Sequence, residues 1–147
     1  MRALSIFTLL TLGAALAADD ATIEPKDLAA RILAGKAASA AKPVVLQVGV
    51  GYQFRAEHIP GAIYAGPAGR PDGLDLLKAA VEKLPRDREI VLYCGCCPWD
   101  KCPNIRPAMA LLRSMGFTRV NAMHIPQTFK ADWVDKGFPV EHGEAAK

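Results

Sequence analysis

Short apolar runs along the chain alternate with stripes of apolar residues at helical spacing. Residues 44–48 are apolar except for Gln47, and residues 90–93 have no polar interruption. Both runs are typical of strands that are buried on both faces of a sheet. Shorter strands are predicted at 62–64 and at 119–123.

Helices are predicted between and after these strands. Helical spacing of apolar residues predicts helices over 25–35, 74–84, 107–116 and 127–136, with Asp72 as the cap of the second helix. Strands that alternate with helices at this spacing favour an α/β fold, and we expect a three-layer sandwich in which helices flank a mostly parallel sheet.

The N-terminal segment has the pattern of a signal peptide. Arg2 precedes an apolar stretch over 3–16, and Ala15 and Ala17 are small residues at the positions that a signal peptidase reads. The stretch is shorter than the roughly 20 residues of a spanning helix, although a retained anchor is the alternative. We therefore expect a signal peptide over 1–17, a periplasmic or secreted protein, and no membrane association after cleavage.

The length and the charge of the chain limit its number of domains and the kind of partner that it can bind. Removal of residues 1–17 leaves a chain that suits one domain, residues 18–147. Only Arg2 is lost from the 18 Lys and Arg residues, so 17 remain against 15 Asp and Glu, a net charge of +2. This balance argues against a nucleic acid partner.

All four cysteines of the chain lie within nine residues. They are Cys94, Cys96, Cys97 and Cys102. A disulfide stabilises most when it closes a long loop, and these cysteines can close only very short ones. They are better explained as a local site, at the carboxyl end of a parallel strand where such sheets bind ligands.

The loop from Cys94 to Arg106 carries the candidate chemistry. A thiol between a strand end and a helix start gains from unpaired N–H groups and from the helix dipole, which favour the thiolate. Arg106 adds a fixed positive charge. The pattern predicts an anion cradle around an activated sulfur, and the residues expected to bind the substrate are Gly95, Cys96, Cys97, Trp99, Asn104 and His124.

Several segments resemble the rhodanese family. Residues 54–63 read Phe-Arg-Ala-Glu-His-Ile-Pro-Gly-Ala-Ile, which is similar to the family's first signature. Residues 90–94 resemble the strand that delivers the family's catalytic cysteine, and residues 110–117 resemble the helix behind it. Trp133 with residues 137–140 resembles the usual tail. The resemblance covers essentially the whole mature chain.

The resemblance implies an exported sulfurtransferase or persulfide carrier. Cys94 would accept a sulfur atom as a persulfide and pass it to cyanide or to a protein thiol, and Arg106 would clamp the anion. The partners would be a small sulfur-containing anion or a protein thiol, and no cofactor is expected. The sequence departs from the family in its longer loop, with eleven residues between Cys94 and Arg106, and in Gln47, where aspartate is common.

Other interpretations of the cysteines remain open. Three roles are open for Cys96, Cys97 and Cys102. They could be resolving thiols that form a disulfide with Cys94, they could form a structural disulfide, or they could bind a soft ion such as zinc or copper(I). A thiol–disulfide redox protein and a non-catalytic metal-binding module are therefore alternatives, and the long loop also leaves an oxyanion reductase or phosphatase open. Cys102 is a second candidate for the catalytic nucleophile, since it lies nearer the helix start.

Histidines and tryptophans complete the candidates. His58 is interpreted as a structural histidine that bonds backbone near the Ile-Pro-Gly turn. His124 follows a strand at the same edge as Cys94, so it is a candidate base or soft-metal ligand. Trp99 is expected as a lid over the loop, and Trp133 as part of the core.

Overall fold

The computed structural model describes residues 21–35 and 42–143. The expected signal peptide, 1–17, lies outside the described residues. Within the described part of the chain, no helix is both long enough and apolar enough to cross a membrane.

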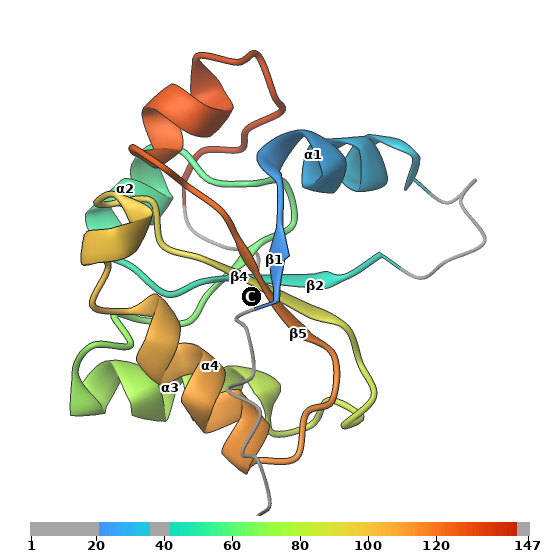
Figure 1. The fold of residues 1–147 in the computed structure, drawn as a ribbon, viewed down its shortest axis with the longest axis vertical. Helices are drawn as coiled ribbons and strands as arrows, with labels where there is room; N and C mark the ends of the chain where they lie inside the picture. The colour runs from blue at the N-terminus through green and yellow to red at the C-terminus, as the bar shows by residue number, and fades with distance from the viewer. Residues whose placement is uncertain (1–20, 36–41, 144–147) are drawn as a thin grey trace, which may run out of the picture.

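A five-stranded, fully parallel sheet forms the centre of the molecule (Figure 1). Its strands lie in the order β1-β5-β4-β2-β3, so β4 is central. The expectation of a mostly parallel sheet is confirmed. The strands are β1 (Thr22–Ile23), β2 (Val44–Gln47), β3 (Ile63–Tyr64), β4 (Ile90–Tyr93) and β5 (Val120–Met123).

Helices cover both faces of the sheet, which gives the expected three layers. In Figure 1, α3 and α4 lie together on one side of the sheet, and α1 and the C-terminal helical turn lie on the other. The helices are α1 (Pro25–Leu33), α2 (Gly51–Ala56), α3 (Pro71–Val81) and α4 (Ile105–Ser114), with a short 3₁₀ turn η2 (Trp99–Lys101) and a π-type turn η3 (Lys130–Val134).

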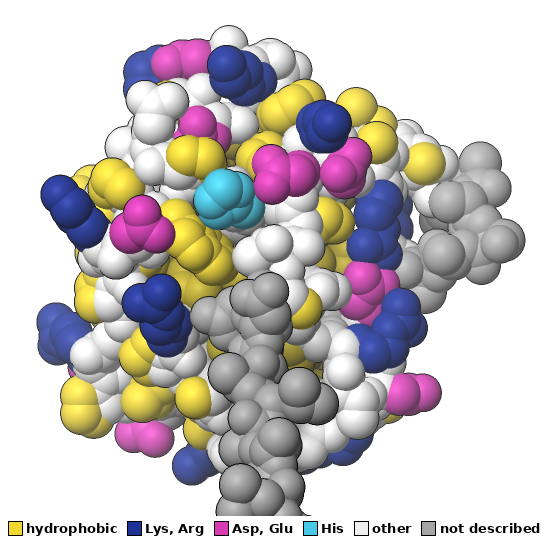
Figure 2. Space-filling model, viewed as in Figure 1, with side chains coloured by type: hydrophobic (Ala, Val, Ile, Leu, Met, Phe, Trp, Pro, Cys, Tyr) yellow, Lys and Arg dark blue, Asp and Glu magenta, His cyan; other side chains and the backbone are white. Residues whose placement is uncertain are grey.

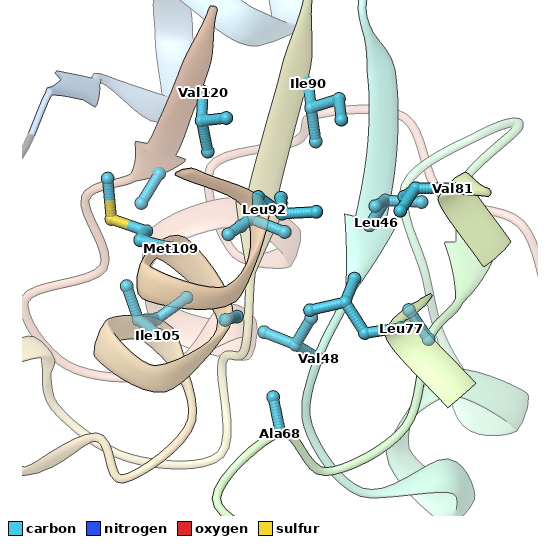
Figure 3. Close-up of a cluster of buried hydrophobic side chains, with 14 of the residues drawn as sticks. Leu46, Val48, Ala68, Leu77, Val81, Ile90, Leu92, Ile105, Met109 and Val120 are labelled. Atoms are coloured by element: carbon cyan, nitrogen blue, oxygen red, sulfur yellow. The ribbon is translucent and has the colours of Figure 1, made fainter. Parts of the chain in front are cut away.

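Successive side chains of β4 point to opposite faces, and both faces are buried. Ile90 and Leu92 pack with Leu46 of β2 against Leu77 of α3 and Leu112 of α4. Figure 3 shows this cluster between the strands and the two helices. A strand whose two faces are both covered must be apolar at every position, which explains the uninterrupted run of residues 90–93.

The second cluster lies on the other face of the sheet. Val45, Val91 and Tyr93 pack there with Leu28 of α1 and with Trp133. Trp133 is fully buried, and its indole Nε1 donates to the carbonyl of Pro139 at 2.8 Å. The prediction that Trp133 belongs to the core is confirmed.

An ion-pair cluster fixes the amino end of β4. Glu89 is buried and accepts hydrogen bonds from Arg31 of α1 at 2.6 and 2.8 Å and from Arg119 at 3.1 Å. The hydrogen bond from Arg31 holds the pKa of Glu89 below its usual value. The cluster therefore joins α1 and the start of β5 to the end of β4 opposite the cysteines.

Two helices begin earlier in the chain than predicted. α3 begins at Pro71 rather than at Leu74, and Asp72 pairs with Arg70 instead of capping the helix. α4 begins at Ile105 rather than at Pro107. Proline is tolerated throughout a first turn because the N–H groups there have no carbonyl partner within the helix. Arg106 consequently lies in α4 and not in the loop.

The two ends of the described chain also differ from the prediction. No strand was predicted at residues 22–23, which form β1 and pair with β5 at the edge of the sheet. A strand of two residues is too short for periodicity to indicate it. The last helix, predicted over 127–136, is the shorter turn Lys130–Val134.

Substitution of a central core residue tests this packing. Leu92→Ala removes a fully buried side chain from β4, and we expect the free energy of unfolding to fall by about 2–5 kcal/mol in urea titrations. Leu33→Ala is the matched control, because Leu33 is 68% exposed and should change that free energy by at most about 0.5 kcal/mol. Equal losses in the two variants would contradict the fold.

Candidate functional site

Cys94 lies directly after the central strand and is buried. Its side chain is 2% exposed. The end of β2 packs closely on it: Gln47 Nε2 donates to the Cys94 carbonyl at 3.3 Å, and a Cβ added to Gly49 would lie 3.0 Å from Cys94 Sγ. The sheet therefore presents this sulfur at the carboxyl edge, between neighbouring strand ends.

Gly95 turns the chain out of the sheet. Its φ of +80° is in the left-handed region that favours glycine. Its carbonyl accepts hydrogen bonds from Gln53 Nε2 at 2.9 Å and from the backbone N–H of Phe129 at 3.0 Å. A Cβ at this position would lie only 2.5 Å from Cβ of Phe129. The residue after Cys94 must therefore be glycine.

The next two cysteines fold back toward Cys94. Cys94 Sγ and Cys96 Sγ are 3.1 Å apart, and Cys96 Sγ and Cys97 Sγ are 3.5 Å apart. The three sulfur atoms lie within 4.8 Å of one another. Three clustered thiols suit either thiol–disulfide chemistry or a soft thiophilic ion.

Asn104 holds Cys94 from the far end of the loop. Its Nδ2 donates to Cys94 Sγ at 3.2 Å, while its Oδ1 accepts from the backbone N–H of Gly69 at 2.8 Å. The side chain is buried, and these two hydrogen bonds set the orientation of its amide. Sequence reasoning expected Asn104 among substrate-binding residues, but the structure places it as a hydrogen-bond donor to the thiol.

The environment of Cys94 favours the thiol and not the thiolate. A hydrogen bond from Cys102 and another from Asn104 lower the pKa of Cys94, but its hydrogen bond to Cys96 and its burial outweigh them and raise that pKa to about 11. The prediction of an acidic Cys94 in the free protein is therefore wrong. The helix start contributes its backbone N–H groups to Cys102 instead, from Asn104 and Ile105.

Cys102 is the partner of Cys94 within the loop. It is half-buried, and its hydrogen bond to Cys94 followed by its burial raises the pKa of its thiol strongly. Cys102 thus keeps its proton and offers it to Cys94. This arrangement favours Cys94 over Cys102 as the nucleophile.

A small pocket opens beside Cys94 Sγ. It has room for roughly one water-sized group. Its walls are formed by sulfur and apolar side chains from the loop, from α4 and from the end of β5. The residues that line it are Cys94, Gly95, Cys97, Trp99, Cys102, Ile105, Met123 and Ile125.

The pocket contains part of the predicted site and adds residues that were not predicted. Ile105, Met123 and Ile125 were missed, although the rule that parallel strands end at one edge points to residues after β5. Cys96, Asn104 and Arg106 are not among the lining residues. Arg106 is exposed on the first turn of α4.

The two aromatic residues at the pocket's edge contact each other. Trp99 lines the pocket, and its backbone N–H donates to the carbonyl of Ile125 at 2.9 Å. Its ring meets that of His124 edge-on, with ring centroids 5.5 Å apart. His124 Nδ1 lies 3.3 Å from Glu24 Oε1, so its side chain turns to the β1 end and not to the thiols.

His58 has the structural role that the sequence predicted. Its Nδ1 lies 2.8 Å from the carbonyl oxygen of Phe54, and its ring stacks on the Phe54 ring with centroids 4.0 Å apart. The residue is buried. The segment that carries the first signature therefore supports the fold beneath the site.

Comparison with known proteins finds one family. The family model of the rhodanese-like domain matches residues 26–125. No curated protein matches the chain.

Solved structures show the same fold. The chain is similar to the rhodanese-like domain of a protein from Anabaena sp., with 24% identity, a TM-score of 0.61, and coverage of 84% of this chain and 80% of that one. A protein from Bacillus halodurans is 21% identical, with a TM-score of 0.63 and coverage of 84% and 77%. A thiosulfate sulfurtransferase from Pseudomonas aeruginosa is 26% identical over 86% of this chain but only 20% of its own, with a TM-score of 0.61.

The hydrogen bond between Cys94 and Cys96 generates a prediction about pH. Cys96→Ala removes the partner that helps to raise the pKa of Cys94, so the pKa should fall below about 11 and the thiolate should form at lower pH. The measurement is the alkylation rate of Cys94 by iodoacetamide against pH, followed by peptide mass spectrometry. The variant and the wild type are compared by the pH at which the alkylation rate reaches half its maximum. A change in the access of iodoacetamide to Cys94 would alter the rate at every pH but would leave this midpoint unchanged. An unchanged midpoint in Cys96→Ala would contradict the assignment.

Proposed function

The chain belongs to the rhodanese-like domain family, and from this membership we propose an exported sulfurtransferase or persulfide carrier that uses Cys94. The observation that carries the proposal is the position of Cys94. Its buried thiol follows the central strand of a parallel sheet and opens onto a pocket. In such sheets ligands bind beyond the carboxyl ends of the strands.

The size and lining of the pocket support the transfer of a single sulfur atom. The space beside Cys94 Sγ is about that of one water molecule, which suits a single bound atom. Ile105, Met123, Ile125 and Trp99 give it a largely apolar wall. A soft, polarisable outer sulfur suits this wall better than a hydrated oxyanion does.

The proposed reaction has two displacement steps. In the first, the Cys94 thiolate attacks the sulfane sulfur of the donor, the donor's S–S bond breaks, and the leaving group departs with the electron pair. With thiosulfate as donor the leaving group is sulfite. In the second step a nucleophile such as cyanide or a protein thiol attacks the outer sulfur, and Cys94 leaves as a thiolate.

The neighbours of Cys94 support formation of the thiolate when the donor arrives. A thiolate at Cys94 accepts hydrogen bonds from Asn104 Nδ2, from the Cys102 thiol and from the backbone N–H of Cys96. Because burial opposes the charge, the thiolate should be a minor form of Cys94 in the free protein. The same burial protects a persulfide from water.

The location and partners are part of the proposal. The pattern of residues 1–17 supports export to the periplasm or the medium. The partners would be a small sulfur-containing anion as donor and a thiophile or protein thiol as acceptor. On the face drawn in Figure 2, basic and acidic side chains are interspersed, in keeping with a chain of nearly balanced charge.

A second candidate function is supported by one distance. Cys94 Sγ and Cys96 Sγ are 3.1 Å apart, which suits a thiol–disulfide redox protein built on the same scaffold. A non-catalytic module that binds a soft ion through Cys94, Cys96 and Cys97 is the third interpretation. Sulfur transfer ranks first because the family model and the position of Cys94 beside the pocket both support it.

Release of sulfite in a single turnover tests the proposal. Reduced protein, freed of reductant and mixed with thiosulfate, should release one equivalent of sulfite per chain. Cys94→Ser should fall to the background without protein. Cys102→Ser should still release one equivalent, because a hydroxyl also donates a hydrogen bond to Cys94, whereas Cys102→Ala should react more slowly because the pKa of Cys94 rises.

The opposite pattern would contradict the proposal. Sulfite release that survives in Cys94→Ser but disappears in Cys102→Ser would move the nucleophile to Cys102. If the wild-type protein releases no sulfite from thiosulfate and does not raise thiocyanate formation from a low-molecular-weight persulfide and cyanide above the background without protein, sulfur transfer is overturned.

A further inference from the structure

Cys96 lies beside Cys94 but has no role in the transfer of sulfur from Cys94 to an outside acceptor. Its Sγ is 3.1 Å from Cys94 Sγ, and the residue is exposed. It is not among the residues that line the pocket. Cys96 therefore reaches the sulfur of Cys94 from outside the space in which an outer sulfur would be held.

A displacement at the sulfur of Cys94 needs an attacking thiol that lies close to Cys94 Sγ and outside the space of the leaving group, as Cys96 does. A thiol that attacks a sulfur atom approaches on the side opposite the leaving group, along the bond that breaks. In a Cys94 persulfide the outer sulfur would occupy the pocket, among Trp99, Ile105 and Ile125. Cys96 would then face the inner sulfur, which is Cys94 Sγ itself.

We infer that Cys96 attacks the inner sulfur of a Cys94 persulfide, closes a Cys94–Cys96 disulfide and releases the outer sulfur as hydrosulfide. The inference rests on the proposed function, because it needs a persulfide at Cys94. The bond between Cys96 Sγ and Cys94 Sγ forms and the bond from Cys94 Sγ to the outer sulfur breaks. The electron pair of the broken bond and the proton of Cys96 leave with the outer sulfur, so the sulfane sulfur is reduced and the two cysteines are oxidised.

The loop geometry allows the disulfide to close. A disulfide bond is about 2.05 Å long, so the two sulfur atoms need to approach by about 1 Å from their present separation. Gly95, the residue between the two cysteines, has no Cβ and a φ of +80°. Glycine gives this short link more freedom to adjust than any other residue would.

The other two cysteines are placed for different roles. Cys97 and Cys102 both line the pocket, so they face the space of the outer sulfur. Attack there by Cys97 would move the persulfide to another cysteine and release no sulfide. Cys102 is half-buried and is held by hydrogen bonds to Cys94 and to the start of α4.

A second turnover requires a dithiol reductant. The disulfide leaves the protein inactive until a dithiol, either a small molecule or a dithiol protein, restores the two thiols. Cys96 is the exposed sulfur of the pair, so the reductant would attack it and free Cys94. A disulfide that is exposed and closes a very short loop is readily reduced.

A single turnover with three readouts tests the inference. Reduced wild-type protein, Cys96→Ser and Cys97→Ser are each freed of reductant and mixed with thiosulfate; sulfite, sulfide and intact mass are measured. We expect the wild type to release one sulfite and one sulfide per chain and to lose two hydrogen atoms. Cys96→Ser should release sulfite but no sulfide, and should gain one sulfur atom. Cys97→Ser should release sulfide with the wild-type stoichiometry, whatever its rate.

Each failure is distinct. Sulfite release from the wild type together with a stable gain of one sulfur and no sulfide would overturn the inference and leave the proposed function standing. Sulfide release that is kept in Cys96→Ser and lost in Cys97→Ser would overturn it in favour of Cys97. Absence of sulfite release from all three proteins, together with no protein-dependent thiocyanate from a low-molecular-weight persulfide and cyanide, would overturn the proposed function and the inference with it.

Discussion

Burial of β4 on both of its faces decides where the sulfur chemistry is placed. Ile90 and Leu92 face α3 and α4, while Val91 and Tyr93 face α1 and the C-terminal turn. The strand cannot shift along its neighbours without exposing these side chains or burying others wrongly. Glu89, held by Arg31 and Arg119, fixes one end of the strand, and Cys94 is presented at the other.

The same burial sets the chemical character of the thiol. A sulfur that is almost removed from water holds its proton, so the pKa of Cys94 rises even though Cys102 and Asn104 donate hydrogen bonds to it. Reactivity then depends on the minor thiolate form, which the hydrogen bonds from Cys102 and Asn104 stabilise. Cys96, which opposes ionisation of Cys94 in the free protein, also has its sulfur 3.1 Å from that of Cys94. Some side chains of the loop thus lower the pKa of Cys94 and others raise it. A substitution at any of them should alter the reactivity of Cys94 Sγ.

The sequence predicted the features that depend on local pattern. β4 was predicted residue for residue, because an uninterrupted apolar run is the direct mark of a strand covered on both faces. The start of α4 was placed at Pro107 instead of Ile105, because proline is common at the first helical position but is tolerated throughout the first turn. The three-layer parallel architecture and the cysteine loop at the carboxyl edge also followed from the pattern.

The rest of the site depends on contacts that no period in the sequence reports. Asn104 reaches Cys94 from the far end of the loop, ten residues further along the chain. Met123 and Ile125 enter the pocket because β5 lies beside β4, whereas His124 between them turns toward Glu24. Whether the pKa of Cys94 is raised or lowered depends on which of the neighbouring thiols donates a hydrogen bond to Cys94 and which accepts one from it. Each of these is a property of the folded loop.

A crystal structure of Cys96→Ser after exposure to thiosulfate would test the central claim most directly, because it shows where the transferred sulfur is carried. We expect one additional sulfur atom bonded to Cys94 Sγ and lying in the pocket beside Trp99 and Ile105. An additional sulfur on Cys102 or Cys97, or a pocket closed by a disulfide between Cys94 and Cys102, would contradict it.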